Sequence, residues 1–310
     1  MAHPDATSDD APLRGRRLIV ATAMLYGLGI VWGLTYPIAK VVTEAGAHPV
    51  GMALLQAVIG CLSLAPIALA RRRPPPLTRR HVPVYVIAGT LGTALPSCVW
   101  FWVAPFLPSG LVAILMALVP MMTLGLALLL GVERFESKRT VGILCGIVAV
   151  ALIVVPDTSL PERAMVWWVL IGLVVPLCYS TENVFLTLRR PADVESATLL
   201  CGMMWAATVL LLPVAWATDG WAWFSWQEDR TGWLFLGLAA INVFAYLTFI
   251  EVIRMAGPVF ASQQGYIVTI TGVLTGMIFL DETHSGWVWV ATAIMMAGLF
   301  LVTPRPHLKG

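Results

Sequence analysis

The sequence predicts an all-α integral membrane protein of ten transmembrane helices, arranged as two inverted repeats of five. Composition is the first reason: 59% of the 310 residues are hydrophobic and 12% are charged, whereas a soluble domain carries about 25% charged residues. The second is a mean hydropathy of +0.84. The third is a succession of long, nearly uncharged stretches joined by short connections. This pattern excludes a soluble multidomain enzyme.

Apolar segments of about 20 residues, the length that crosses a hydrocarbon core of about 30 Å, occur ten times. The first five cover 18–42, 49–70, 82–104, 107–130 and 139–155. The second five cover 165–188, 196–217, 232–253, 258–280 and 286–303. Polar tails, 1–17 and 304–310, lie outside these spans.

The lysines and arginines predict the direction of the spans. If the N-terminus is cytoplasmic, all of them except Lys40, Arg163 and Arg230 fall on the cytoplasmic side. This asymmetry follows the positive-inside rule, so we expect both termini in the cytoplasm and a multi-pass protein of a bacterial-type inner membrane. The basic linker RRRPPPLTRR (71–80) lies on that side, where its charge suits anionic lipid rather than nucleic acid.

The two halves resemble each other at a shared offset of about 147–149 residues. LSLAPIAL (62–69) aligns with VLLLPVAW (209–216), and Glu133 aligns with Glu282. Since each half holds five spans, the second must be inverted relative to the first. We therefore expect two repeats, at 18–155 and 165–303. Inverted repeats are typical of secondary transporters, whose substrates bind near the midplane between them.

Several motifs resemble the EamA family of the drug/metabolite transporter superfamily. They are VWGLTYPIAK (31–40), LMALVPMMTLGLALLLGVERF (115–135), GILCGIVAVALIV (142–154) and the segment from GPVFASQQGY to MMAGLFLV (257–302). The resemblance covers about 18–303. It implies ten helices around a central cavity, alternating access, and export of small metabolites such as amino acids, often aromatic ones.

Two positions depart from the pattern of that family and its repeat. Thr269 stands where the repeat places Pro120, and Gln56 stands where many relatives carry an arginine. These departures concern the interior of the bundle, so the mechanism of the relatives does not transfer to this chain without change.

Glu182 is the strongest single candidate for a functional residue. It lies within LCYSTENVFL (177–186), where no other charge occurs between Met165 and Leu188. A carboxylate at the centre of a bilayer costs at least about 2.5–3.5 kcal/mol. Glu182 precedes Arg189 by seven residues, about 10 Å along a helix. It either pairs with Arg189 or reaches a small aqueous vestibule, or it serves as a proton site or the counter-charge of a substrate amine.

Other polar and aromatic side chains deep in the spans are candidates for lining a cavity. An amide, hydroxyl or indole group there needs a partner, which helix–helix hydrogen bonds or a bound zwitterion would supply. These residues are Trp32, Tyr36, Gln56, Trp100, Tyr179, Asn242, Tyr246, Gln263, Gln264 and Tyr266. Prolines are expected to bend the helices and to free carbonyls nearby; they are Pro37, Pro96, Pro120 and Pro176.

Other charged, aromatic and cysteine residues have structural interpretations. Glu133 and Glu282 follow their spans directly, which favours capping or ion pairing at the membrane interface, and Glu251 with Arg254 predicts an ion pair within one helix. A tryptophan belt is expected at Trp221, Trp223, Trp226 and Trp233. The five cysteines lie in apolar runs without a metal-binding spacing, so we expect neither a metal nor a cofactor.

The sequence thus favours a secondary active exporter of amphipathic metabolites, most of all amino acids. The expected partners are a small-molecule substrate and the lipid bilayer, and a monomer is compatible with the sequence. A multidrug or quaternary-cation exporter is the first alternative, and an intramembrane enzyme or lipid-handling protein the second. No Walker motif, HExxH or GxSxG occurs, and no set of catalytic groups is visible around Glu182.

Overall fold

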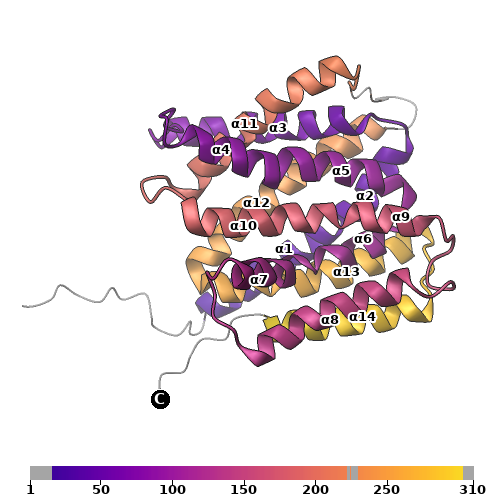
Figure 1. Ribbon diagram of the computed structural model, residues 1–310. Helices are drawn as coiled ribbons and strands as arrows, with labels where there is room; N and C mark the ends of the chain where they lie inside the picture. The colour runs from indigo at the N-terminus through magenta and orange to yellow at the C-terminus, as the bar shows by residue number, and fades with distance from the viewer. Residues whose placement is uncertain (1–15, 222–223, 225–229, 303–310) are drawn as a thin grey trace, which may run out of the picture.

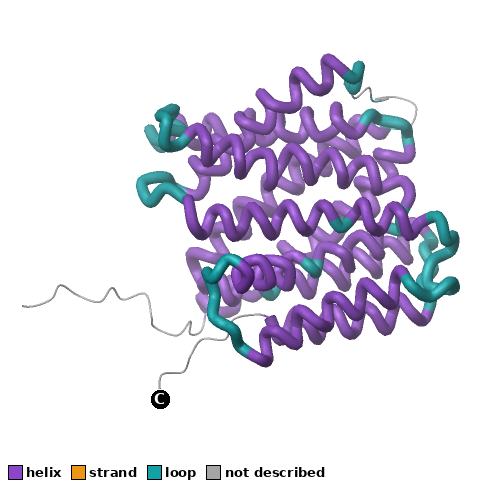
Figure 2. Tube along the Cα trace, in the orientation of Figure 1, coloured by secondary structure: helices purple, strands orange, loops and turns teal. Residues whose placement is uncertain are grey.

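The computed structural model describes residues 16–221, 224 and 230–302. Within these ranges the chain forms helices and turns and no strand, packed into one bundle (Figure 1; Figure 2). The prediction of an all-α fold is therefore confirmed.

The helices follow one another along the chain. In the first half they are α1 (Arg16–Gly33), α2 (Thr35–Glu44), α3 (Pro49–Ala70), α4 (Val82–Gly89), the π-helix η2 (Thr90–Ala94), α5 (Leu95–Val103), the 3₁₀-helix η3 (Ala104–Phe106), α6 (Ser109–Met116), α7 (Val119–Leu129) and α8 (Ser137–Val154). In the second half they are α9 (Met165–Gly172), α10 (Val174–Arg189), α11 (Ser196–Ala217), α12 (Thr231–Ser262), α13 (Gln264–Leu280) and α14 (Gly286–Val302).

These helices coincide with the predicted spans. Among the described residues, nine helices are long and apolar enough to cross a membrane, and the shorter apolar helix Gly286–Val302 lies at the tenth predicted span. Spans eight and nine lie close to their predicted bounds, at Thr231–Ala256 and Phe260–Leu280, and the backbone of α12 stays helical as far as Ser262. The Glu251–Arg254 ion pair, three residues apart, lies near the end of span eight on α12.

Three spans are broken at a fixed distance before a proline. The helices α1, α6 and α9 each end four residues before one, at Pro37, Pro120 and Pro176 respectively. A proline ring displaces the carbonyl four residues earlier and offers it no N–H. The sequence position of each proline therefore accounts for where the first segment of the span stops and the second begins.

The third span absorbs its proline without a break. Pro96 cannot donate to the carbonyl of Gly92, and here the chain forms the π-helix, in which the N–H of Leu95 bonds to the carbonyl of Thr90, five residues back. Such π segments are rare and occur frequently at functional sites.

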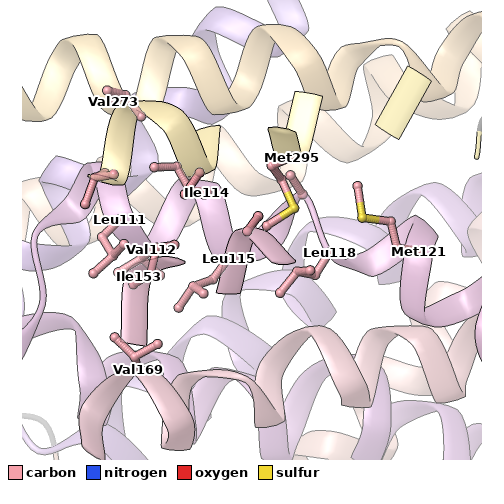
Figure 3. Packing of buried hydrophobic residues seen from close by; sticks show 14 of the residues in the cluster. Leu111, Val112, Ile114, Leu115, Leu118, Met121, Ile153, Val169, Val273 and Met295 are labelled. Atoms are coloured by element: carbon pink, nitrogen blue, oxygen red, sulfur yellow. The ribbon is translucent and has the colours of Figure 1, made fainter. Parts of the chain in front are cut away.

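The packing of the spans follows a regular scheme. The helix α8 packs on α14, and α3 packs on α11; these are spans five with ten and two with seven. Likewise α1 packs on α13 and α12, as α10 packs on α7 and α5. The scheme is symmetric under exchange of each span in the first half with its counterpart in the second half. The pairs five–ten and two–seven are unchanged by this exchange, and the contacts of span one with spans nine and eight become those of span six with spans four and three. The largest hydrophobic cluster surrounds α6, where Leu111, Ile114 and Leu115 lie between Val273 and Met295 on one side and Val169 on the other (Figure 3).

The bundle has two chemically different ends. The α3–α4 and α10–α11 connections lie together at the left of Figure 1, at the end where α1 begins and α14 stops. We call it the Arg-rich end, after Arg16, Arg71, Arg139 and Arg189. The opposite end carries the α13–α14 connection and is called the Glu282 end.

Candidate functional site

The carboxylate of Glu182 lies directly against the backbone of the π-helix. Glu182 is on α10, and Gly92 is the central residue of η2. A Cβ atom built on Gly92 would stand 2.5 Å from Cδ, 2.5 Å from Oε1 and 2.6 Å from Oε2 of Glu182. The absence of a side chain at position 92 is therefore what makes room for the acid.

Glu182 is half-buried, and no basic side chain among the described residues lies within ion-pairing distance of it. Arg189 does not pair with it, and Arg190 instead donates to the hydroxyl of Ser196 at 2.9 Å. The intrahelical pair considered from the sequence is therefore absent. A carboxylate without a counter-charge in a membrane interior must be hydrated, protonated or bound to a cation.

A group of aromatic side chains extends from Glu182 across the bundle. The carboxylate is close enough to the phenols of Tyr179 and Tyr246 to interact with them electrostatically. Tyr179 is in turn within electrostatic range of Tyr36, which meets Trp100 edge to face with ring centroids 5.1 Å apart. Four of the predicted cavity residues, on α10, α12, α2 and α5, thus lie in the same part of the bundle as Glu182.

Trp32 and Asn242 satisfy one another instead. The indole N–H of Trp32 donates to Oδ1 of Asn242 at 3.1 Å, joining α1 to α12. The Asn242 amide donates in turn to the carbonyl of Leu238, also at 3.1 Å. This is the helix–helix hydrogen bond that the sequence allowed as the structural alternative.

The three glutamines and Tyr266 have different surroundings. Gln56, on α3, is half-buried and makes no hydrogen bond within the described part of the chain. Gln263 is exposed at the junction of α12 and α13, while Oε1 of Gln264 is buried without a partner there. Tyr266 packs against the same large cluster around α6 as Tyr36 and Trp100. Within the described part of the chain, none of the three glutamines is hydrogen-bonded to Glu182.

Two interrupted spans meet beside Glu182. Ser180, fully buried, donates its hydroxyl to the carbonyl of Val119 at 3.0 Å and to that of Pro176 at 2.6 Å. One turn away, the amide of Asn183 donates to the hydroxyl of Thr123 at 3.4 Å. These bonds tie α10 to α7 where both spans are weakened by proline.

Sequence reasoning did not single out Gly92 or the tie made by Ser180. A signal for Gly92 was present: it stands four residues before Pro96, where the helical hydrogen bond must be lost. That its open side faces Glu182 depends on how span three packs on span six, and a single sequence does not contain that information.

Three spans are tied together at the Glu282 end. The Glu282 carboxylate accepts hydrogen bonds from the N–H of Ser109 at 2.6 Å, its hydroxyl at 3.1 Å, and the N–H of Gly110 at 3.1 Å. Lys40 donates to the carbonyl of Leu107 at 2.9 Å. A pocket of about 200 Å³ lies between these groups. The predicted capping role of Glu282 is confirmed.

The other structural predictions have mixed outcomes. Glu133 pairs with Arg139 at 3.0 Å, and Glu251 pairs with Arg254, as expected. In the predicted tryptophan belt, Trp233 is exposed, whereas Trp221 is only partly so and packs against a hydrophobic cluster of α2, α3 and α12. Trp223 and Trp226 lie outside the described residues. The five cysteines are free thiols.

Comparison with known proteins identifies the family of this chain. The model of the EamA-like transporter family matches residues 20–155 and again 166–303. The chain is 25% identical over 300 residues to the uncharacterized inner membrane transporter YedA of Escherichia coli K12, covering 96% of this chain and 94% of the relative. It is 25% identical over 277 residues to PecM of Dickeya dadantii, covering 88% of each.

Two further similarities concern function and fold. A protein of Streptantibioticus cattleyicolor described as a probable terminal-alkyne amino-acid exporter is 24% identical over 279 residues, covering 89% of this chain and 91% of the relative. A solved crystal structure has a TM-score of 0.60 at 19% identity, over 92% of this chain and 96% of that one, which supports the fold alone. Since the family model covers both halves, the chain is a membrane protein that belongs to the EamA-like transporter family.

Proposed function

We propose that the protein is a secondary active exporter of small amphipathic metabolites, above all amino acids and including aromatic ones. The observation that carries the proposal is the Glu182 carboxylate, held without a counter-charge against the π-helix and beside the interrupted spans. An ammonium group entering this site would supply the missing positive charge. It would offset part of the cost of keeping a carboxylate inside the membrane.

The interrupted spans support alternating access. Breaks occur in spans one and six and in spans four and nine, which are corresponding positions of the two halves. Discontinuous helices in corresponding positions mark the substrate site of transporters built from inverted repeats. The exchangeable helix pairs also support such a two-fold arrangement. Transport would then consist of one repeat rocking against the other around Glu182.

The aromatic group supports the class of substrate. Tyr36, Trp100, Tyr179 and Tyr246 offer flat apolar surface beside a carboxylate, which suits an amino acid with an apolar or aromatic side chain. One relative is described as an amino-acid exporter. The same combination of a carboxylate and aromatic rings would attract a permanent organic cation. A quaternary-cation exporter is therefore the second candidate.

An intramembrane enzyme is a poorer account of the site. Among the described residues, Glu182 has no hydrogen bond to a histidine, serine or lysine that would form a catalytic pair with it, and the relatives named by activity are transporters. The arginine asymmetry supports a cytoplasmic position for the Arg-rich end. Glu182 would then receive its substrate from the cytoplasmic side, two helical turns from Arg189.

Reconstituted transport tests the proposal. Purified wild-type protein and Glu182→Gln are placed in liposomes, and uptake of labelled L-phenylalanine, L-threonine and tetraphenylphosphonium is measured with and without a pH gradient. Glu133→Gln is the matched control, because its carboxylate pairs with Arg139 away from the site. We expect saturable amino-acid uptake that is lost in Glu182→Gln and kept in Glu133→Gln. Saturable uptake of the cation alone, above that of protein-free liposomes, would favour the second candidate, and no such uptake of any compound would refute both.

A further inference from the structure

Gly92 shapes the recess that holds the Glu182 carboxylate. The three heavy atoms nearest to a Cβ at position 92 all belong to that carboxylate, and each lies within 2.6 Å. Ordinary contacts between heavy atoms begin near 3.5 Å, so any side chain at 92 would have to displace the acid by about 1 Å. The position of the charge is thus fixed by a missing side chain on the facing span.

The π-helix explains why the glycine faces Glu182. Because Pro96 has no N–H, the hydrogen-bond pattern of span three shifts from four to five residues between Thr90 and Ala94. This extra residue turns the following part of the helix relative to the preceding part. Gly92 stands at the centre of the shift, where the backbone comes close to α10 without an intervening side chain.

We propose that Gly92 is a positioning residue that sets how a substrate ammonium meets Glu182, an inference that rests on the function proposed above. With no Cβ at 92, the carboxylate lies against the backbone of the π-helix, within electrostatic range of the phenols of Tyr179 and Tyr246. A substrate ammonium would meet the acid from the side away from Gly92. Displacing the acid by about 1 Å changes the position at which it meets that ammonium.

Gly92→Ala tests the proposal because it adds one methyl group at a point where the three nearest heavy atoms all belong to Glu182. Alanine favours a helix over glycine by about 0.5–1 kcal/mol, so the backbone itself is not expected to suffer. Gly237→Ala is the matched control: Gly237 is an exposed glycine of α12, and a Cβ there would meet nothing within 4 Å. Glu182→Asp shortens the acid by one bond, about 1.5 Å, and thereby makes room for the added methyl.

For uptake of L-phenylalanine into liposomes, we expect Gly92→Ala to raise KM on the order of 10-fold or more, since misplacement by 1 Å has effects of that size. Gly237→Ala keeps the wild-type KM. The double variant Gly92→Ala/Glu182→Asp transports better than Gly92→Ala alone, which a purely structural defect at position 92 would not allow. A wild-type KM in Gly92→Ala, or a double variant worse than both single variants, would overturn the proposal.

Thermal stability in detergent gives a readout that does not depend on transport. Gly92→Ala should lower Tm when Glu182 is present and should not lower it in a Glu182→Ala background, because the atoms that it meets are then gone. If Gly92→Ala lowers Tm equally in both backgrounds, the glycine is not needed to make room for the Glu182 carboxylate. If this coupling is found but wild-type protein carries no compound of the panel, the function proposed above fails while the contact between residues 92 and 182 stands.

Discussion

Glu282, just beyond α13, caps the first turn of α6 through Ser109. Its two carboxylate oxygens accept the N–H of Ser109 at 2.6 Å and its hydroxyl at 3.1 Å. The cap joins the ninth span to the fourth, and so the second half of the chain to the first. A carboxylate at a helix N-terminus is also favoured by the helix dipole. The side chain of Glu282 is only 7% exposed.

Replacing Glu282 by Gln should destabilise the protein. One carboxylate oxygen becomes an amide NH₂ group, which is a donor. It would point at the N–H and hydroxyl donors of Ser109 and Gly110, so that donors face each other without an acceptor. Leaving such a donor unsatisfied costs about 1–3 kcal/mol, which we expect to lower Tm in detergent by several degrees.

Glu133→Gln is the control for the loss of charge, because Glu133 is more exposed and forms a peripheral ion pair. Its removal is expected to cost less than about 1 kcal/mol. Equal Tm values for Glu282→Gln and Glu133→Gln would show that the cap does not hold the two halves together.

His284 should make stability depend on pH. It lies in the α13–α14 connection with its side chain 2% exposed, and Nε2 is 4.0 Å from Oε2 of Glu282. Burial lowers the pKa of His284, against a smaller opposing effect of Glu282. The unfolded chain therefore takes up a proton near pH 6.5 while the folded protein does not. Stability is highest above that pH and decreases as the pH falls.

Thermal unfolding at pH 8 and pH 5.5 checks this sign. We expect wild-type protein to lose Tm on acidification, and His284→Gln to lose less of it, since glutamine fills similar space and does not titrate. His48→Gln serves as a control for the replacement of a histidine. His48 lies just before α3, at the same Glu282 end of the bundle. The explanation is wrong if His284→Gln and wild-type protein show the same decrease.

Much of the fold could be predicted from the sequence because the signals are local. The length of an apolar run fixes a span, and a proline fixes where a helix must lose a hydrogen bond, as at Pro37 and Pro176. The same signals predict spans eight and nine close to where they lie, although the backbone of α12 stays helical beyond the predicted end of span eight.

The candidate site could be predicted only in part, because it depends on packing between distant segments. Glu182 was identifiable, since a lone acid in an apolar run is costly wherever it faces. Its partner across the interface was not, because Gly92 has no chemistry of its own and matters only through what lies opposite it. For the same reason the sequence could not separate Trp32 from Tyr179, although both are deep aromatic residues.

The structure predicts different consequences for these two aromatic residues. Trp32→Phe removes the hydrogen bond to Asn242 and should reduce stability, by about 0.6–1.7 kcal/mol as for comparable bonds within membranes. It should leave KM nearly unchanged. Tyr179→Phe removes a phenol near Glu182 and should raise KM for L-phenylalanine with little change in Tm. Uptake and Tm measured on both variants decide the matter, and a reversed pattern would place the site around Trp32.

Pro96→Ala should convert the π-helix into a regular α-helix. The new N–H at position 96 can bond to the carbonyl of Gly92, so the shift in hydrogen bonding between Thr90 and Ala94 is no longer required. We expect stability to remain the same or to rise, because a proline in a helix interior is unfavourable by about 3 kcal/mol relative to alanine. Transport should fall, because Gly92 turns away from Glu182 as the register changes.

Pro66→Ala provides the comparison, since Pro66 also lies inside a transmembrane helix, α3, which continues through it without a π segment. That variant should keep wild-type uptake of L-phenylalanine while gaining stability in the same way. A gain in Tm together with loss of uptake in Pro96→Ala alone would separate the geometry of the third span from the general effect of removing a proline. If Pro96→Ala transports as well as Pro66→Ala, the π-helix does not contribute to the position of Glu182.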